Sequence, residues 1–313
     1  MALAFPLGAG VTQAAEPQDL FPAPVYVTLQ SSDAVQHLPT DNTWNGLSGA
    51  HYDAIGPDGT RMLVSSKDSP EAYLLNAHTG EKLATFKVGP VPQGMTISPN
   101  GRWGLAVSAG DGTVAVIDLR EQRVIKSVKV GKTPHNVRFT SDGKRAYVTL
   151  QGAGSVAVID MRTLKMVKAF PVPGIKHPHN LDLSADGKVL WIRGLIGKVA
   201  AVDLQSHEVL AVIPVGLGHA GIDVIPGGRY VFTGAIADHV VDVIDPTTFN
   251  VVKSIDVGQG PHGVRASRDG RWVYVAVTGT DKVAVIDVKT LKVVKQIPTR
   301  GKLPFWIAVA GND

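Results

Sequence analysis

The sequence predicts an all-β fold, a seven-bladed β-propeller of four-stranded antiparallel blades. Three observations support this: a turn motif that recurs at a nearly constant period, a second motif in phase with it, and parts of one further repeat near both ends. Four-stranded sheets that repeat every 40 to 45 residues stack around an axis, because each sheet covers the apolar face of its neighbour. The composition is globular, with 44% apolar residues, 34 Gly and 20 Pro in 313 residues.

The first motif is a turn of the form small/polar-x-[DNG]-G, followed by a short polar step and an apolar run. Its glycines are separated by 42, 42, 44, 41 and 42 residues. They are Gly59, Gly101, Gly143, Gly187, Gly228 and Gly270. A D-G or N-G step supplies positive φ at low cost, so we expect this turn to join the first and second strands of each blade.

The second motif is an apolar run that ends in aspartate: TVAVIDL at 113, SVAVIDM at 155, KVAAVDL at 198, VVDVIDP at 240 and KVAVIDV at 282. Within one period, between residues 136 and 170, the runs NVRFT, AYVTLQ, VAVID and MVKAF have the character of four short strands. We expect the aspartates to cap the turn into the fourth strand through their side chains. They are Asp118, Asp160, Asp203, Asp245 and Asp287.

The seventh blade is divided between the two ends of the chain. LPFWIAVAGND at 303–313 aligns as a first strand, and PVYVTLQSSDAVQHL at 24–38 aligns as the second and third strands. YVTLQ occurs at both 26–30 and 147–151, which sets the register of this alignment. We therefore expect residues 16–313 to form a single propeller domain, whose ring is closed by strands from both termini and has no open sheet edge.

Residues 1–15 predict export. They carry no charge, are mainly apolar through Val11 and end in small residues, as a secretory signal does, with cleavage after Ala14 or Ala15. A disordered cytosolic leader is the alternative. We expect a periplasmic or secreted monomer, and no other stretch approaches the 18 apolar residues of a membrane span.

The composition also excludes several kinds of site. Without cysteine the chain has no disulfide, no thiolate metal ligand, no thiol nucleophile and no covalent c-type haem attachment. The net charge is only +4 and no cluster of Lys and Arg stands out, so we expect no nucleic-acid partner. The motifs of serine hydrolase elbows, P-loops and H-E-x-x-H zinc enzymes are absent.

The residue that precedes each predicted first strand is often histidine. In chain order this series is His51, Gln93, His135, His179, Ala220, His262 and Phe305. Because first strands are innermost, these side chains are expected at one mouth of the central channel. The expected metal ligands are His51, His135, His179 and His262, with His177 and His219 as second candidates and His239 further out. The other interpretation is that each ring packs on its neighbour or bonds a carbonyl.

Three residues further along, the first strands carry polar and charged residues. The series is Thr96, Arg138, Asp182, Asp223 and Arg265 in blades two to six. One interpretation is a mutually neutralising structural network. The other is binding of a carboxylate or another anion by the guanidinium forks of Arg138 and Arg265, with Asp182 beside them and Arg193 as a weaker candidate.

Other residues are expected to have supporting roles near the mouth. Asp53 stands where most other blades have Val, Leu or Ile, and we expect its carboxylate to orient a ligating histidine. Four aromatic residues, Trp44, Tyr52, Phe305 and Trp306, are expected to wall the mouth. Trp306 can stack on a planar ligand there, although packing at the seam blade explains it equally well.

GKTPHNVRFTSDGKRAYVTLQGAGSVAVID and GQGPHGVRASRDGRWVYVAVTGTDKVAVID resemble the YVTN-type propeller repeat of bacterial exported proteins. The wider superfamily includes the d-type haem domain of cytochrome nitrite reductases and lactonase-like propellers. His51, in GAHYDAIGPDG, resembles the surroundings of the proximal haem ligand. The resemblance therefore implies a haem, while axial histidines also resemble the copper sites of nitrous oxide reductases, without their motif order.

We therefore predict an exported propeller that binds a metal ion or metallo-cofactor, of copper or haem type, at the axial mouth. Imidazoles without thiolates suit copper, zinc, iron or nickel. A redox-active centre would exchange electrons with a soluble partner protein. One alternative is a non-catalytic scaffold for protein or cell-envelope components. Another is a lactonase-like hydrolase that uses His51 with Asp53 or His179 with Asp182.

Overall fold

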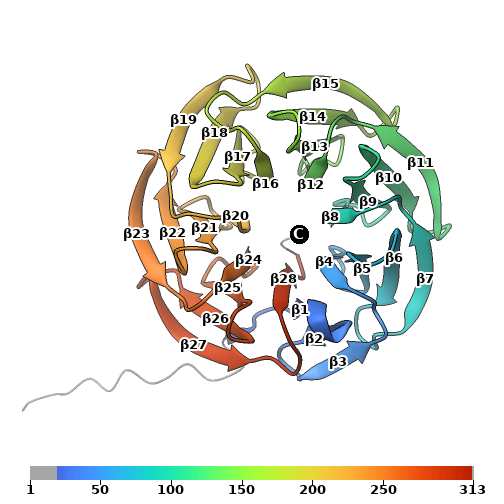
Figure 1. Cartoon of the computed structure of the whole chain (residues 1–313), viewed down its shortest axis with the longest axis horizontal. Coiled ribbons are helices and arrows are strands. Elements are labelled where there is room, and N and C mark those ends of the chain that lie inside the picture. The colour runs from blue at the N-terminus through green and yellow to red at the C-terminus, as the bar shows by residue number, and fades with distance from the viewer. Residues whose placement is uncertain (1–19, 312–313) are drawn as a thin grey trace, which may run out of the picture.

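The computed structural model describes residues 20–311, and within this range the chain forms a closed ring of seven four-stranded sheets. Figure 1 shows the sheets arranged around an axis, with one strand of each sheet at the centre and one at the rim. The predicted seven-bladed, all-β architecture is thus confirmed. The predicted signal segment, residues 1–15, lies outside the described residues.

Each blade runs from an innermost to an outermost strand (Figure 1). The innermost strands are β4 (Ala50–Ile55), β8 (Pro92–Ile97), β12 (Pro134–Phe139), β16 (Pro178–Leu183), β20 (Ile222–Val224), β24 (Pro261–Ala266) and β28 (Pro304–Val309). The second strands are β5 (Arg61–Ser66), β9 (Trp103–Ser108), β13 (Arg145–Leu150), β17 (Val189–Gly194), β21 (Val231–Ala235), β25 (Trp272–Val277) and β1 (Val25–Leu29).

The third strands are β6 (Glu71–Asn76), β10 (Thr113–Asp118), β14 (Ser155–Asp160), β18 (Lys198–Asp203), β22 (Val240–Asp245), β26 (Lys282–Asp287) and β2 (Ala34–His37). The outermost strands are β7 (Lys82–Lys87), β11 (Arg123–Lys129), β15 (Lys165–Pro171), β19 (Val209–Pro214), β23 (Asn250–Asp256), β27 (Lys292–Pro298) and β3 (Asn42–Asn45). A short 3₁₀ turn, η2 (Gln30–Ser32), links β1 to β2.

The seam blade joins the two ends of the chain as predicted. Its strand order is β28-β1-β2-β3, and β28 pairs antiparallel with β1. The residues paired across this seam include Val25 with Val309 and Val27 with Ile307. All four of these side chains are fully buried, so the closure is part of the hydrophobic core.

The recurring turns have the chemistry that the sequence predicts. Gly143, at the hairpin between β12 and β13, has a φ of 66°, and the preceding Asp142 accepts a hydrogen bond from the backbone N–H of Lys144 at 3.0 Å. Asp287 accepts hydrogen bonds from the N–H groups of Lys289 and Thr290 at 2.7 and 2.9 Å. The other four predicted capping aspartates bond their own turns in the same manner.

A β-bulge at the start of the inner strands decides where the histidines point. In β12, the two consecutive residues His135 and Asn136 lie opposite the single residue Thr149 of β13. The Thr149 hydroxyl accepts a hydrogen bond from the N–H of Asn136 at 2.9 Å and donates one to the carbonyl of His179 at 2.7 Å. The same kind of register shift occurs in β4, β8, β16 and β24, so the extra residue in each can turn toward the axis.

Glycines allow neighbouring inner strands to approach closely. A Cβ on Gly94 would stand 2.8 Å from the backbone of Asn136, and a Cβ on Gly263 would stand 2.8 Å from the carbonyl oxygen of Phe305. Contacts this short exclude any side chain at these two positions. The four larger residues of the same layer, Tyr52, Asn136, Asn180 and Trp306, are all buried.

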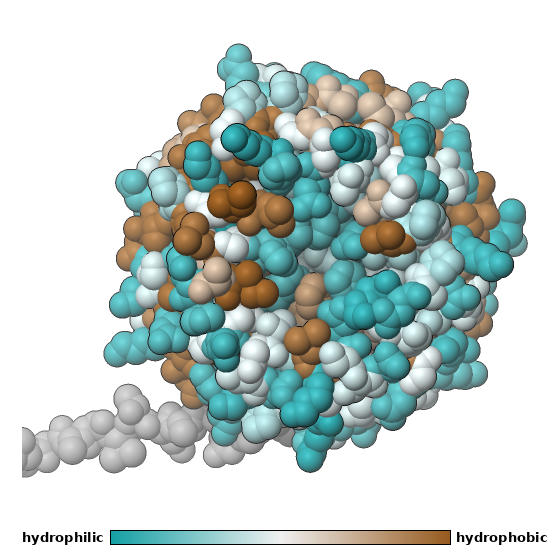
Figure 2. Space-filling model, in the orientation of Figure 1, coloured by the Kyte–Doolittle hydropathy of each residue, from teal (hydrophilic) through white to brown (hydrophobic). Residues whose placement is uncertain are grey.

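The hydrophobic core is distributed between neighbouring blades. One cluster, for example, contains Leu63 and Leu74 of one blade and Ala106 and Ile117 of the next. The face shown in Figure 2 is mostly hydrophilic, with hydrophobic residues in separate small groups. The described part of the chain contains no helix that is long and apolar enough to cross a membrane.

Candidate metal or cofactor site at the axial mouth

Aromatic rings line the mouth at which the inner strands begin. Consecutive centroids are 3.6 Å apart for His135–His179, 4.7 Å for His179–His219, 5.2 Å for His219–His262, 3.8 Å for His262–Phe305 and 4.3 Å for Phe305–His51. Gln93 continues this series, since its Oε1 lies 3.2 Å from His51 Nε2. The predicted placement of these side chains at a common mouth is thus observed.

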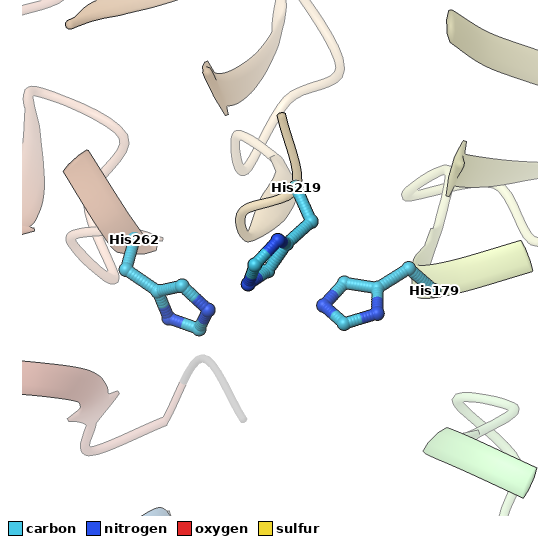
Figure 3. Close-up of side chains that lie close together, drawn as sticks. All are labelled: His179, His219 and His262. Carbon is cyan, nitrogen blue, oxygen red and sulfur yellow. The ribbon is translucent and has the colours of Figure 1, made fainter. Parts of the chain in front are cut away.

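Three of the histidines converge on one point. His179, His219 and His262 each offer a ring nitrogen, and the three nitrogens lie within 4.8 Å of one another. Figure 3 shows the three rings pointing toward one another from neighbouring blades. Two of the three are primary candidates from the sequence, and His219 is a second candidate. We call this set the histidine triad.

Hydrogen bonds decide which nitrogen of a ring is available. His262 Nδ1 donates to the carbonyl of Phe305 at 3.1 Å, so its Nε2 carries the lone pair. The Nε2 atoms of His262 and His179 are buried and have no hydrogen-bond partner within residues 20–311. Because a buried polar atom without a partner carries a desolvation cost, these two atoms are suited to receive a ligand.

His219 reaches the triad from a loop that polar side chains hold in place. The buried guanidinium of Arg193 donates to the carbonyls of Gly216 and Gly218 at 2.8 and 2.5 Å. Asp242 accepts a hydrogen bond from the N–H of Gly216 at 2.7 Å. Arg193, a weak anion-binding candidate from the sequence, thus contacts the loop that carries His219.

Burial favours the neutral form of the histidine rings at the mouth. It lowers the pKa of His51 to about 4 and that of His135 to about 3. It also lowers the pKa values of His179 and His262 well below their usual range, with a further lowering from neighbouring histidines. The pKa of His219 is lowered by burial and by the charge of Arg193. Neutral imidazole is the form that ligates metal ions.

The remaining sequence candidates lie around the triad. His135 stacks on His179, and its Nδ1 donates to the carbonyl of that residue at 3.1 Å. His51 lies on the other side of Phe305, beside Gln93. His177 is exposed, and its Nδ1 lies 3.2 Å from the carbonyl of Gln151. His239 is also exposed, in the turn between β21 and β22.

Amide side chains that were not predicted from the sequence bond to one another beneath the rings. Asn136 Nδ2 donates to Asn180 Oδ1 at 2.5 Å, and Asn180 Nδ2 donates to the carbonyl of Ala220 at 2.8 Å. Gln151 lies beside the triad, with its Nε2 3.4 Å from His179 Nδ1. The available signal was the repeated P-H-N at 134–136 and 178–180 and the Q of YVTLQ.

Below the amides lies the layer of charged residues, where the two predicted arginines differ. Arg265 donates to Asp223 at 2.8 Å and lies over the ring of Trp306, so it belongs to a structural network. Arg138 contacts Asp182 only loosely, with Nε 3.7 Å from Oδ1. Burial raises the pKa values of Asp182 and Asp223, and the charge of Asp182 raises that of Asp223 further.

Three further residues that the sequence singles out are placed by the structure. Trp44 lies on the outermost strand β3 of the seam blade, tilted against Tyr26, so the prediction that it walls the mouth is wrong. Asp53 is buried, and its charge adds to the effect of burial in raising the pKa of Tyr26 to about 12. Trp306 is 2% exposed and packs on Tyr52 with ring centroids 4.3 Å apart.

The fold and the site together define the class of protein: it is a seven-bladed propeller with converging neutral imidazoles at its axial mouth. The chain belongs to the family described as the cytochrome D1 heme domain, which matches residues 62–181 and 189–304. A second family, the YNCE-like beta-propeller, matches residues 135–228. No curated protein matches the sequence.

Many solved structures are similar to this one, and three of them are described here. Hydrazine synthase of Kuenenia stuttgartiensis is 20% identical with a TM-score of 0.76, and the match covers 84% of this chain and 90% of that one. A functionally unknown protein from Desulfotomaculum acetoxidans is 15% identical with a TM-score of 0.81, covering 93% and 100%. Dihydro-heme d1 dehydrogenase NirN, in complex with DHE, is 18% identical with a TM-score of 0.68, covering 98% and 78%. At these identities the likeness concerns the fold.

Proposed function

We propose that this protein binds a transition-metal ion, alone or at the centre of a haem-type cofactor, through the histidine triad. The observation that carries the proposal is the convergence of three ring nitrogens within 4.8 Å, together with the buried Nε2 atoms of His179 and His262, which have no hydrogen-bond partner among the described residues. Low pKa values leave the imidazoles neutral at physiological pH, so no proton competes with the metal.

The spacing of the triad is compatible with one ion. Nitrogen ligands of a tetrahedral zinc or copper ion, at about 2.0 to 2.1 Å from the metal, stand about 3.4 Å from one another. The nitrogens of the triad lie within 4.8 Å of one another, so they would have to approach by at most about 1.4 Å to reach this separation. The amide of Gln151 lies beside His179 Nδ1. When the amide oxygen accepts a hydrogen bond from Nδ1–H, the lone pair of the ring is on Nε2, and this atom can bind the metal ion.

Family membership favours a haem-type cofactor as the source of the metal. One imidazole of the triad is sufficient to hold a haem iron from one side, and the bound iron would supply redox chemistry or ligand binding. The chain itself would hold the iron through a neutral imidazole and fix that ring by the bond from His262 Nδ1 to Phe305. We further propose, from residues 1–15, that the protein is exported and exchanges electrons with a soluble partner.

Elemental analysis and visible spectra of the protein purified without a tag would test this proposal. The wild type is expected to contain or to take up about one metal ion or haem per chain. The double variant His179→Ala/His262→Ala is expected to lose it, whereas His177→Ala, a histidine at an exposed position, keeps it. Equal metal content in the double variant and the wild type would refute the assignment of the triad. Failure of the wild type to take up copper, zinc or haem would refute the proposed function.

A further inference from the structure

A second site lies at the opposite end of the central channel. A cavity of about 990 Å³ is bounded by the ends of β8, β12 and β16 and by the hairpin turns that follow them. The inner strands begin at the histidine rings and end at this cavity, with the amides and the charged residues between the two. The cavity is therefore separate from the histidine triad.

Arg138 is the buried polar group that faces this cavity. The residue is 5% exposed, yet it lines the cavity wall. Its single ion pair among the described residues is the loose one with Asp182, at 3.7 Å from Nε, and no described residue accepts a hydrogen bond from its Nη atoms. Arg265 holds the same position in the inner strand of blade six as Arg138 holds in blade three, but it is bound at 2.8 Å to Asp223. A buried guanidinium with open donors is a receptor for an anion.

The charged side chains at the rim of the cavity also favour the binding of an anion. Lys144 and Lys188 are paired with Asp142 and Asp186, carboxylates that also accept hydrogen bonds from their own turns. Two further arginines line the cavity, and neither forms an ion pair within residues 20–311. They are Arg145 and Arg268. Counted with the fourth lining carboxylate, Asp203, the lining has five cationic side chains and four acidic ones, and this small positive excess favours anions.

The walls between these charges are apolar. Phe139, Leu183 and Ile225 contribute side chains to the lining, together with Pro226. The volume is that of a metabolite-sized site, and such sites combine apolar walls with a few polar groups that fix orientation. A planar carboxylate matches the fork of one guanidinium, whereas a phosphate dianion would be repelled by the adjacent Asp182 carboxylate.

We propose that this cavity binds a small organic carboxylate, whose oxygens accept hydrogen bonds from the Nη atoms of Arg138 and whose apolar body lies against Phe139, Leu183 and Ile225. Asp182 limits the charge that the site accepts, because it stands beside the same guanidinium. The site thereby selects monoanions over dianions.

Isothermal titration calorimetry of the full chain with benzoate would test this proposal, with benzamide and inorganic phosphate as comparisons. Benzoate is expected to bind saturably at one site per chain, and benzamide, which lacks the charge, to bind at least about tenfold more weakly. Arg138→Lys keeps the positive charge but loses the fork, so we expect about a tenfold or greater loss of benzoate affinity. Lys176→Gln, the removal of a positive charge on an exposed residue beside His177, is expected to change nothing.

Asp182→Asn provides a readout in the opposite direction. It removes the competing negative charge while its side-chain oxygen can still accept from the N–H of Val224, so benzoate is expected to bind more tightly. Absence of benzoate binding, equal affinity for benzoate and benzamide, tighter binding of phosphate, or unchanged affinity in Arg138→Lys would each overturn the proposal. Metal content, measured on the same samples, is expected to stay at the wild-type level in all these variants, which keeps this test separate from that of the triad.

Discussion

Removing the strand that closes the ring is expected to unfold the protein. Deletion of residues 303–313 takes away β28, in which Trp306 is 2% exposed and Ile307 and Val309 are fully buried. Burial of each such side chain stabilises the fold by about 1.5 to 3 kcal/mol, which gives about 5 to 9 kcal/mol for the three. The whole stability of a folded protein is about 5 to 15 kcal/mol, so the truncated chain should retain little or none.

A point substitution in β28 tests the same reasoning with a partial loss of stability. Ile307→Ala is expected to cost about 2 to 5 kcal/mol, because the side chain packs among Val25, Val27 and Val285 of adjoining strands. Val294→Ala, a similar truncation at a 46% exposed position on β27, should stay within about 0.5 kcal/mol of the wild type. Urea unfolding followed by circular dichroism measures both values. A deletion variant with a wild-type unfolding midpoint would refute the reasoning that the seam holds the ring closed.

Three further predictions follow from buried charges and turns. Between pH 7.0 and 5.5 His135 becomes protonated in the unfolded chain but not in the folded chain, where its pKa is about 3. On this change of pH, metal-free His135→Asn should therefore lose about 1.2 kcal/mol less stability than the wild type. Urea titrations at both pH values that give the same loss for the variant and the wild type would contradict this. Asp223→Ala removes the carboxylate that is bound at 2.8 Å to buried Arg265 and should cost about 3 kcal/mol, with the double variant Asp223→Ala/Arg265→Met less destabilised; a larger loss in the double variant would count against it. Gly143→Ala, at a φ of 66°, should cost about 1 kcal/mol in thermal unfolding, and no loss would show that the turn can rearrange.

The blades could be predicted because the residues that repeat with the period of the blades shape turns in their own part of the chain. Gly143 provides positive φ and Asp287 bonds its own turn, so both motifs mark the ends of strands directly in the sequence. Strand β3 (Asn42–Asn45) was not predicted, since NTWN contains a single apolar residue and has no alternation. The bulge at His135 also left no pattern, because it depends on the hydroxyl of Thr149 in the neighbouring strand.

The mouth and the candidate histidines could be predicted from the sequence, but which three of these histidines converge could not. Sevenfold spacing places His51 and His262 at the same height, yet it says nothing of the direction of each ring. His51 faces Gln93, whereas His219 is carried toward His179 by a loop that Arg193 holds from another blade. Such contacts between distant segments are fixed by tertiary packing and are not encoded in the repeat.

The split seam blade has a consequence for the order of events during synthesis. Strand β28 begins at Pro304, 279 residues after the start of β1 at Val25. At about 5 to 20 residues per second, the ribosome needs about 15 to 55 s to make the intervening chain. Throughout this interval the backbone edge of β1 lacks the strand that will cover it, and an open edge can pair with other chains. The blade whose strands are made first is completed last, so the nascent chain must keep that edge from aggregating until β28 has been made.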